Sequence, residues 1–398
     1  KTIEEYCSLL MQAHEDRGIE LSSEEMARYA RHLALPEIGL SGQQKLKGSS
    51  VLCIGSGGLG SAVLLYLAAA GVGRIGIVDS DVVEDSNLQR QVLHGTNWLA
   101  KPKTASARAR ILEINPNCQV ETFQTQLTTE NALKIIKKFD VICDCTDNFP
   151  SRYLINDACV ILGKPNIYGS IARFEGQATV FNLNNHSPNY RDLVPEPPPQ
   201  GLLASCEEGG VIGVLPGLIG IIQATEVIKI ITKIGNPLSG RLLTFDALTL
   251  KFKELTLQPS PHRKAISCLI NYEDFCSGKI YLKPNDKSLS IASISVRQLR
   301  DLIDNEPESI TLLDVRNPYE YKTGSIKGAT LTPLQSIKDG QSIEFIRNIA
   351  KTKQIYVYCK SGQRSAKALI ELRQHNINGI NIDGGMDAWS LEFPTTHY

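Results

Sequence analysis

The chain has 398 residues and equal numbers of basic and acidic side chains, 42 Lys plus Arg against 42 Asp plus Glu. This balance, without long runs of like charge, gives no support to nucleic acid or an anionic membrane as a bulk electrostatic partner. The longest apolar stretch, 211–234, is interrupted by glycines and a proline and contains charged residues, Glu226 and Lys229 among them, so no membrane span is expected.

The length predicts two or more domains. The first residues, KTIEEYCSLL, lack the basic head and cleavage site of a signal peptide. Ten cysteines are scattered through apolar contexts, which is typical of free thiols in a reducing compartment. We therefore expect a cytoplasmic protein, or a protein of the plastid stroma if an organelle encodes it.

From about residue 50 to 170, short apolar runs alternate with amphipathic stretches, the rhythm of a parallel sheet covered by helices. Strands are predicted at 51–54, 74–78, 119–123, 141–144 and 165–168. Helices are predicted at 59–70, 103–114, 129–139 and 150–162. This order predicts a right-handed, doubly wound, Rossmann-like α/β domain.

Residues 184–210 break the rhythm with a Pro-rich run that is too irregular for a strand or helix, and long loops of this kind are usually functional or disordered. Two strands are then expected at 241–245 and 252–257. A smaller α/β unit follows, with helices at 296–303, 342–350 and 364–374 and strands at 310–313, 355–358 and 380–382. We expect domains at 1–258 and 290–398, joined by a linker at 259–289.

A nucleotide loop is predicted where Gly55, Gly57 and Gly60 form GxGxxG between a strand and a helix, because backbone amides and the helix start can hold a phosphate there. Asp79 ends the next strand, at a spacing suited to a ribose hydroxyl. The pattern does not separate a dinucleotide from ATP. A glycine turn used only for close helix packing is the structural alternative.

Three further polar residues at predicted strand ends favour nucleotidyl transfer over hydride transfer. Arg90 and Lys103 can stabilise the charge that builds on phosphates, and Asp147 can bind Mg²⁺. Each also has a structural interpretation, since the two cations can be solvated surface charges and Asp147 a helix cap. Their joint placement on one edge of the sheet favours adenylation.

The segments GSGGLG, DSDVVEDSNLQRQ, KPK, DCTDN and PGLIGIIQATEVIK, within residues 22–257, resemble the E1-like adenylyltransferases that activate sulfur-carrier proteins. The resemblance implies ATP with Mg²⁺ at Asp147, and a homodimer in which Arg31 reaches into the partner's ATP site. The nucleotide-binding set expected from motif and resemblance is Gly55, Gly57, Gly58, Gly60, Asp79, Ser86, Asn87, Leu88, Gln89, Arg90, Lys103, Asp147 and Asn148.

The same resemblance implies a working thiol at Cys206, after the Pro-rich run, although Glu207 and Glu208 oppose its ionisation and a merely packed cysteine is the alternative. Family members often hold a structural zinc with two CxxC pairs. Here 189–192 reads NYRD, and 261–270 offers only Cys268. Four ligands are needed, so we expect no zinc.

The second unit carries Cys359 in CKSGQRS, between a predicted strand and helix, where loop amides and the helix start can stabilise a thiolate and then a persulfide. Gly362 permits the tight loop, and Arg364 and Ser365 add a charge and a hydroxyl. With LDVR, YEY and GGMDAW, the loop resembles the CxxGxRS loop of rhodanese sulfurtransferases. A phosphatase cradle is the alternative, but such loops place five residues, not four, between Cys and Arg.

Together these motifs predict an enzyme that adenylates the C-terminal glycine of a small ubiquitin-like, β-grasp sulfur carrier ending in Gly-Gly. A persulfide on Cys359, loaded by a cysteine desulfurase or another donor, then gives the thiocarboxylate. The small subunit of molybdopterin synthase is the preferred carrier, which implies molybdenum cofactor biosynthesis; carriers for tRNA or thiamine thiolation stay open. Activation of a ubiquitin-like modifier through a Cys206 thioester, and an NAD-binding dehydrogenase or sensor, are the other hypotheses.

Overall fold

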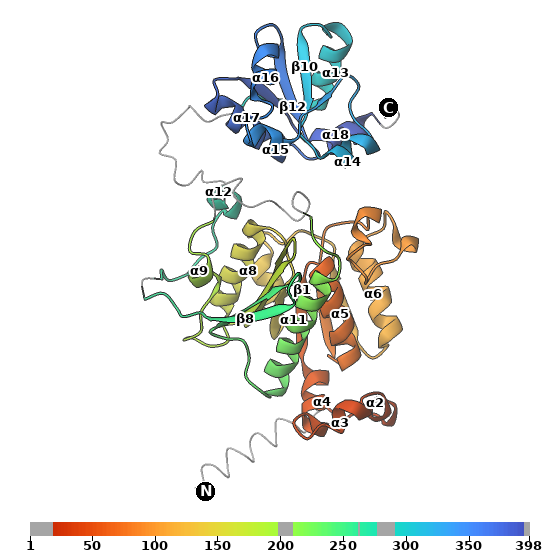
Figure 1. Ribbon diagram of the computed structural model, residues 1–398. Coiled ribbons are helices and arrows are strands. Elements are labelled where there is room, and N and C mark those ends of the chain that lie inside the picture. The colour runs from red at the N-terminus through yellow and green to blue at the C-terminus, as the bar shows by residue number, and fades with distance from the viewer. Residues whose placement is uncertain (1–18, 198–209, 262, 277–290, 394–398) are drawn as a thin grey trace. The chain divides into compact units, whose positions relative to one another are not determined.

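The computed structural model describes residues 19–197, 210–261, 263–276 and 291–393. The chain divides into two compact units, Lys1–Ile280 and Tyr281–Tyr398 (Figure 1). Each unit has its own sheet and its own buried core. The fold class expected from the sequence is thus confirmed, while the domain boundaries at 258 and 290 stay a prediction.

Within the described residues, the first unit contains an eight-stranded sheet in the order β3-β2-β1-β4-β5-β6-β7-β8. The first five strands in this order are parallel and the last three antiparallel. Their bounds are β1 Ser50–Ile54, β2 Arg74–Val78, β3 Gln119–Phe123, β4 Val141–Asp144, β5 Asn166–Ala172, β6 Glu175–Phe181, β7 Arg241–Asp246 and β8 Lys251–Thr256. The sequence pattern did not predict β6.

Helices cover both faces of this sheet, as a doubly wound fold requires (Figure 1). On one face, α5 contacts α6 and α11, and on the other α8 contacts α7, α9 and α12. The bounds are α5 Gly58–Ala70, α6 Lys103–Ile114, α7 Ala132–Ile136, α8 Phe149–Leu162, α9 Tyr190–Leu193, α11 Leu215–Thr232 and α12 Tyr272–Cys276, with short 3₁₀ turns η2 Asp85–Asn87 and η3 Thr96–Trp98.

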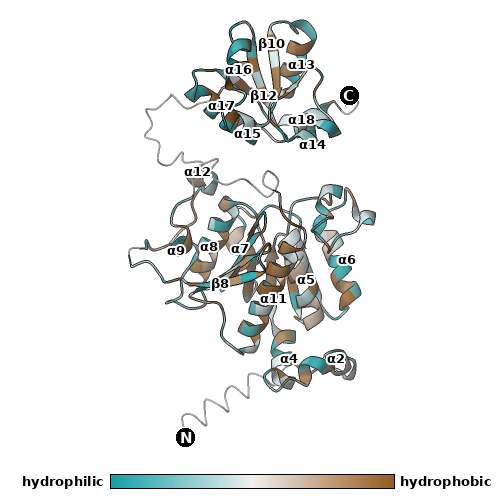
Figure 2. Cartoon of the chain, in the orientation of Figure 1, coloured by the Kyte–Doolittle hydropathy of each residue, from teal (hydrophilic) through white to brown (hydrophobic). Residues whose placement is uncertain are grey.

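Helix α11 is, within the described ranges, the one helix long and apolar enough to cross a membrane (Figure 2). It runs unbroken through Gly217 and Gly220, which the sequence analysis took as interruptions. Its polar groups are nevertheless used inside the unit. The Gln223 amide donates to the backbone oxygens of Asp144 and Ile167, at 2.8 and 3.0 Å. Because a buried amide bridges two neighbouring strands, α11 is the central helix of a folded core.

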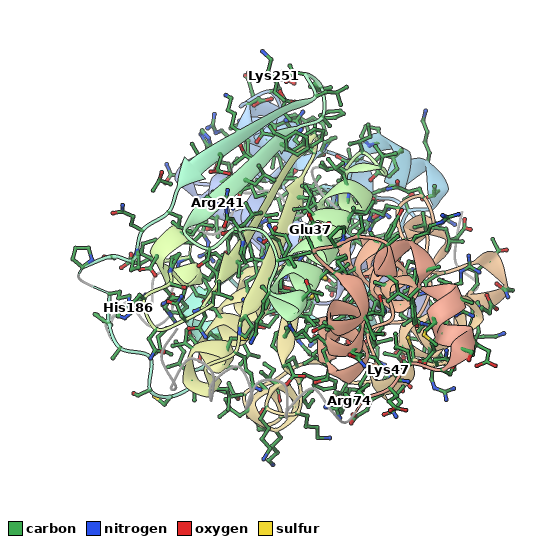
Figure 3. The ribbon with its side chains drawn as sticks, turned by 90° about the horizontal axis from the view of Figure 1, so that it is seen from below. Glu37, Lys47, Arg74, His186, Arg241 and Lys251 are labelled. Carbon is green, nitrogen blue, oxygen red and sulfur yellow. The ribbon has the colours of Figure 1, made fainter. Side chains whose placement is uncertain are left out.

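Three short helices, α2 Ser23–Arg28, α3 Ala30–Leu33 and α4 Gly39–Gly48, lie at the end of the unit where the parallel strands begin (Figure 1). The backbone amide of Arg74, at the start of β2, donates to the Ser49 oxygen just after α4. Figure 3 shows Lys47 and Arg74 close together at this edge. The Tyr29 hydroxyl accepts a 2.7 Å bond from Asn115 beyond α6. These contacts fix α2–α4 at the opposite end from the glycine turn after β1.

Two segments expected to be irregular are partly folded. Asn189 and Asp192 form a reciprocal capping box around α9, because each side chain accepts a backbone amide at the helix start. In the segment 259–289, Tyr272 and Phe275 of α12 are buried in the core of the first unit. The expected linker therefore includes a stretch anchored by apolar packing.

The second unit has a five-stranded parallel sheet in the order β11-β10-β12-β13-β9 over the described residues. The strands are β9 Ser293–Ile294, β10 Ile310–Asp314, β11 Thr330–Leu331, β12 Gln354–Tyr358 and β13 Gly379–Ile382. The helices are α13 Val296–Asn305, α14 Pro318–Thr323, α15 Leu334–Lys338, α16 Ile343–Ile349, α17 Gln363–Gln374 and α18 Gly385–Glu392. Two buried clusters hold the sheet to its helices.

The bridge made by Gln223 predicts a stability effect. We expect Gln223→Leu to lower the free energy of unfolding of the first unit by about 1–3 kcal/mol, because buried hydrogen bonds are lost without loss of volume. Thr225→Val is the matched control, since its hydroxyl bonds the Ile221 oxygen on an exposed part of the same helix. Urea unfolding of both variants measures the difference; equal stabilities would contradict the prediction.

Candidate functional sites

A cleft of about 300 Å³ opens at the carboxyl ends of β1, β2 and β4. This is the edge at which open α/β sheets bind ligands. Among the residues expected from the sequence, those that line it are Gly55, Gly57, Gly58, Asp79, Lys103, Asp147 and Asn148. The structure therefore brings together the ends of three strands, the glycine turn and the first residue of α6.

The glycine turn gives the cleft an anion-binding wall. Gly55 has φ of 91°, and a side chain there would meet the Cys145 carbonyl oxygen at 2.8 Å. Gly57 is the N-cap of α5, so the open amides of the first helical turn face the cleft. Gly60 does not line the cleft; it packs behind the turn, where a side chain would strike the Gly55 carbonyl oxygen. Its role is close packing of helix on turn.

Asp79 fixes the turn from the end of β2. One carboxylate oxygen accepts from the Ser56 amide and hydroxyl, both at 2.8 Å. The other accepts from the Asp81 amide at 2.9 Å. His94 also contacts this turn. Its Nε2 lies 2.9 Å from the Ser56 backbone oxygen, and its Nδ1 lies 2.9 Å from the Ser106 hydroxyl. Burial lowers the pKa of His94, which favours the neutral ring.

Lys103 supplies a buried cation at the cleft. Only 5% of the residue is exposed. Its Nζ lies 2.9 Å from the Asp81 carboxylate, whose own side chain is 64% exposed. An anion in the cleft can therefore displace a well-solvated partner at little cost, since exposed ion pairs contribute little. Asp81 lies within the segment DSDVVEDSNLQRQ, but the sequence pattern indicates no role for it.

The segment 86–90 lies beside the cleft rather than in its lining. Ser86, Asn87, Leu88 and Gln89 belong to the η2 turn and the residues after it. The stem of Arg90 passes the glycine turn, with Cγ 3.7 Å from where a Gly58 Cβ would stand, and its guanidinium donates to the Ser86 oxygen at 3.2 Å. Their role as nucleotide ligands stays a prediction.

Arg31 lies on α3, exposed, at the opposite end of the sheet from the cleft of its own chain. Helix α4 connects α3 to the start of β1, and the cleft lies beyond the other end of that strand. Arg31 therefore does not line the cleft of its own chain.

Two further cleft residues were given no role from the sequence. Gln91 lines the cleft next to the glycine turn, and its buried Oε1 has no hydrogen-bond partner among the described residues. Arg152 follows the Asn148 cap by one turn of α8, is 8% exposed, and donates to the Thr146 oxygen at 3.3 Å. Asp144 beneath it has a raised pKa because it is buried, although the charge of Arg152 opposes that shift. The one-turn spacing from Asn148 was the signal that could have identified Arg152.

Cys359 directly follows β12 in the second unit and is 1% exposed. Its sulfur accepts from the Gly362 amide at 3.2 Å and lies 3.5 Å from the Ser365 hydroxyl. Gly362 has φ of 93° and is the N-cap of α17, so the chain turns back sharply under the sulfur. This arrangement can stabilise negative charge on sulfur.

Arg364 supports the loop around the Cys359 sulfur through its pairing with Glu320. Its guanidinium makes two bonds of 2.6 and 2.7 Å to the Glu320 carboxylate, and both side chains are largely buried. Burial disfavours the ionised form of Glu320, but the bonds from Arg364 and the Asn317 amide outweigh it and lower the pKa of Glu320. The pair thus ties the first turn of α17 to α14.

Cys206 lies outside the described residues. Among the free cysteines within them, burial raises the pKa of Cys118 and of Cys276 to about 11, and that of Cys143 and Cys145 still further. These thiols are poor candidates for sulfur transfer.

Two family models match the chain, the ThiF family over residues 29–269 and the rhodanese-like domain over residues 295–392. A relative from Mycobacterium tuberculosis, "Probable adenylyltransferase/sulfurtransferase MoeZ", is 44% identical over 376 residues, or 94% of each chain. "Probable molybdopterin-synthase adenylyltransferase" of Porphyra purpurea is 39% identical over 93% of this chain and 94% of its own. "Adenylyltransferase and sulfurtransferase MOCS3" of Arabidopsis thaliana is 37% identical over 94% and 86%.

Solved structures agree on the fold of the first unit. The structure of the microcin C7 biosynthetic enzyme MccB in complex with N-formylated MccA has a TM-score of 0.55 at 21% identity, and covers 63% of this chain and 77% of its own. A crystal structure of E. coli MccB with ATP has a TM-score of 0.52 at 20% identity, over 66% and 81%.

The Arg364 pair predicts a pH-dependent contribution to stability. Because the pKa of Glu320 is lowered from 4.5 in the fold, its ionised form stabilises the second unit above that pH, and the effect is lost as the pH falls through the lowered value. We expect Glu320→Gln to lower the free energy of unfolding at pH 7 by about 1.5–3 kcal/mol. The deficit should shrink at acid pH.

Urea unfolding in a Trp98→Phe background measures this, since Trp389 is then the only tryptophan and is buried in the second unit. Glu308→Gln is the control, because that carboxylate is 97% exposed and 3.6 Å from Lys353. A deficit that does not change with pH would contradict the assignment.

Proposed function

Since the chain belongs to the family of adenylyltransferase/sulfurtransferases that join a ThiF unit to a rhodanese-like unit, we propose that it converts the C-terminal carboxylate of a small sulfur carrier into a thiocarboxylate. Family membership confirms the enzyme class expected from the sequence. One observation carries the proposal: the same chain holds an amide-lined anion cleft with a buried lysine and a cysteine in an amide cradle.

In the first step, the carrier carboxylate attacks the α-phosphorus of ATP, and the bond to pyrophosphate breaks. The amides of the glycine turn and Lys103 hold the phosphate charge that develops. Asp79 is placed for the ribose hydroxyls. Asp147 fits Mg²⁺, since its exposed carboxylate faces the cleft beside the Asn148 amide and oxygen ligands suit this ion. Bound there, Mg²⁺ would neutralise phosphate charge.

In the second step, the terminal sulfur of a Cys359 persulfide attacks the acyl carbon, and the bond to AMP breaks. The acyl disulfide is resolved when the Cys206 thiolate attacks the Cys359 sulfur, which releases the thiocarboxylate and leaves a disulfide for a cellular thiol to reduce. A cysteine desulfurase or another persulfide donor reloads Cys359. The chemistry needs reduced thiols, so we place it in the cytoplasm or plastid stroma.

The preferred carrier is the β-grasp small subunit of molybdopterin synthase, which makes this a step of molybdenum cofactor biosynthesis. The name of the Porphyra purpurea relative supports the choice. Carriers for tRNA or thiamine thiolation use the same chemistry. Only an experiment with each candidate carrier distinguishes them from the small subunit of molybdopterin synthase.

The function is tested by incubating candidate carriers with the enzyme, ATP, Mg²⁺ and a sulfur donor. We expect pyrophosphate exchange that depends on the carrier, and a carrier mass that gains one sulfur for one oxygen. Lys103→Met should slow exchange by about 100-fold, as removal of one preorganised charge does. Cys359→Ala should keep exchange and abolish the sulfur gain. A carrier thioester at Cys206 without sulfur gain would instead indicate activation of a modifier.

The distance of Arg31 from its own cleft supports a homodimer in which Arg31 completes the partner's site. We expect Arg31→Ala and Asp147→Asn each to be inactive alone. Mixed and allowed to exchange subunits, they should regain about a quarter of wild-type exchange, because half of the dimers then hold one intact site. If Arg31 acts on its own chain, mixing will restore nothing, and if it does not act at all, Arg31→Ala will be active alone.

A further inference from the structure

Asp192 joins two stretches of the first unit that are far apart in the sequence. Its side chain is 0% exposed. It accepts from the Asn189 amide at 2.9 Å, the Ser260 amide at 2.7 Å and the Arg263 guanidinium at 3.2 Å. Arg263 also donates to the backbone oxygens of Ser187 and, at 3.3 Å, Asn185. The chain after β8 is therefore fastened to the segment before α9.

Asp157 makes a second attachment to the chain after β8, through Tyr272. It is 1% exposed, on α8, and accepts two bonds of 2.9 and 2.7 Å from Arg191. The Tyr272 hydroxyl of α12 donates to it at 2.8 Å. Burial and the charge of Asp157 raise the pKa of Tyr272, so this hydroxyl stays a donor. The Arg191 guanidinium lies 5.0 Å from the ring of Phe275, also on α12.

These are the two stretches between which the family resemblance would place a zinc ion. The residues present do not fit one. A guanidinium faces the Asp192 carboxylate, and three N–H donors already use its oxygens. Zinc in a structural site takes four thiolate, imidazole or carboxylate ligands. An ion pair with backbone bonds stands here in place of metal coordination.

We propose that Asp192 and Asp157 form a metal-free clip that holds residues 258–276 on the first unit, and that the clip sets the length of chain joining the two units. The residues between the described parts of the units, 277–290, number 14. Release of 258–276 would raise the number that joins the units to 33. The inference on sulfur transfer rests on the proposed function; the anchoring itself does not.

A longer connection lowers the effective concentration of one unit at the other by roughly the −3/2 power of its length, here about three- to four-fold. Adenylation takes place within the first unit and is unaffected by this length. Asp192, Asp157 and their partners are positioning residues, because they act through the segment they hold and none of them lines the nucleotide cleft.

The test compares Arg263→Gln, Tyr272→Phe and the double variant with wild type, in the full chain. Hydrogen exchange reports the protection of residues 258–276. Pyrophosphate exchange reports adenylation, and single-turnover sulfur transfer from preloaded Cys359 reports coupling. We expect the double variant to lose protection at 258–276 and to transfer sulfur three- to four-fold more slowly, with pyrophosphate exchange unchanged.

Arg241→Gln is the matched control. Arg241, labelled in Figure 3, also makes one ion pair, to Glu254, and donates to two backbone oxygens in the same unit. It should change none of the three measurements. Unchanged protection in the double variant, stoichiometric bound zinc in wild type, or pyrophosphate exchange that falls in step with sulfur transfer would overturn the clip. A wild type without pyrophosphate exchange would instead refute the proposed function, while the protection measurement would still test the anchoring.

Discussion

Both candidate sites lie at a turn where a parallel strand ends and a helix begins, and both present backbone amides suited to negative charge. After β1, the amides at the start of α5 face a cleft suited to phosphate, and after β12 the Gly362 amide at the start of α17 donates to the Cys359 sulfur. Each turn requires a glycine with positive φ, 91° at Gly55 and 93° at Gly362, which other residues rarely adopt. The remaining charges of each site are arranged around these turns.

The two sites differ in whether their cations are free to exchange partners. Lys103 pairs with Asp81, which is well exposed and loses little when the lysine turns to another anion. Arg364 pairs with Glu320 in a mostly buried, two-point contact whose loss would strand a buried charge. The first arrangement suits a cation that must meet a transient phosphate. The second suits a cation that keeps the loop after Cys359 in one conformation.

The sequence predicted the strands that are apolar throughout, and so it located the turns that follow them. β2 begins and ends where the pattern places it, because a strand buried in a parallel sheet needs a continuous apolar run. The bounds of β3 also match, although it is a partly exposed strand at the edge of the sheet and carries polar residues. β6 was missed because Gly176 and Gln177 interrupt its pattern and its pairing with β5 is antiparallel. The GxGxxG motif at 55–60 and the Cys359 motif could be recognised in the sequence, because local backbone geometry dictates their residues.

Contacts between residues far apart in the sequence could not be predicted from local sequence patterns. Arg364 was assigned to the sulfur, yet its guanidinium binds Glu320, 44 positions earlier in the chain. Likewise, the prolines after β8 indicate a linker, whereas Tyr272 reaches Asp157 across 115 positions and buries α12. A charged or aromatic side chain does not reveal its partner locally, so each such assignment needed the tertiary structure.

Among the described cysteines, burial alone does not separate Cys359, the sulfur proposed to react, from the others. Cys143 and Cys359 are both buried at or after the end of a parallel strand. Burial raises the pKa of Cys143, and neighbouring Cys53 and Asp144 raise it further, so its thiol stays protonated. The Cys359 sulfur instead accepts hydrogen bonds from the Gly362 amide and the Ser365 hydroxyl. The donors supplied by a strand-to-helix turn, rather than access to solvent, therefore distinguish the sulfur suited to carry a persulfide.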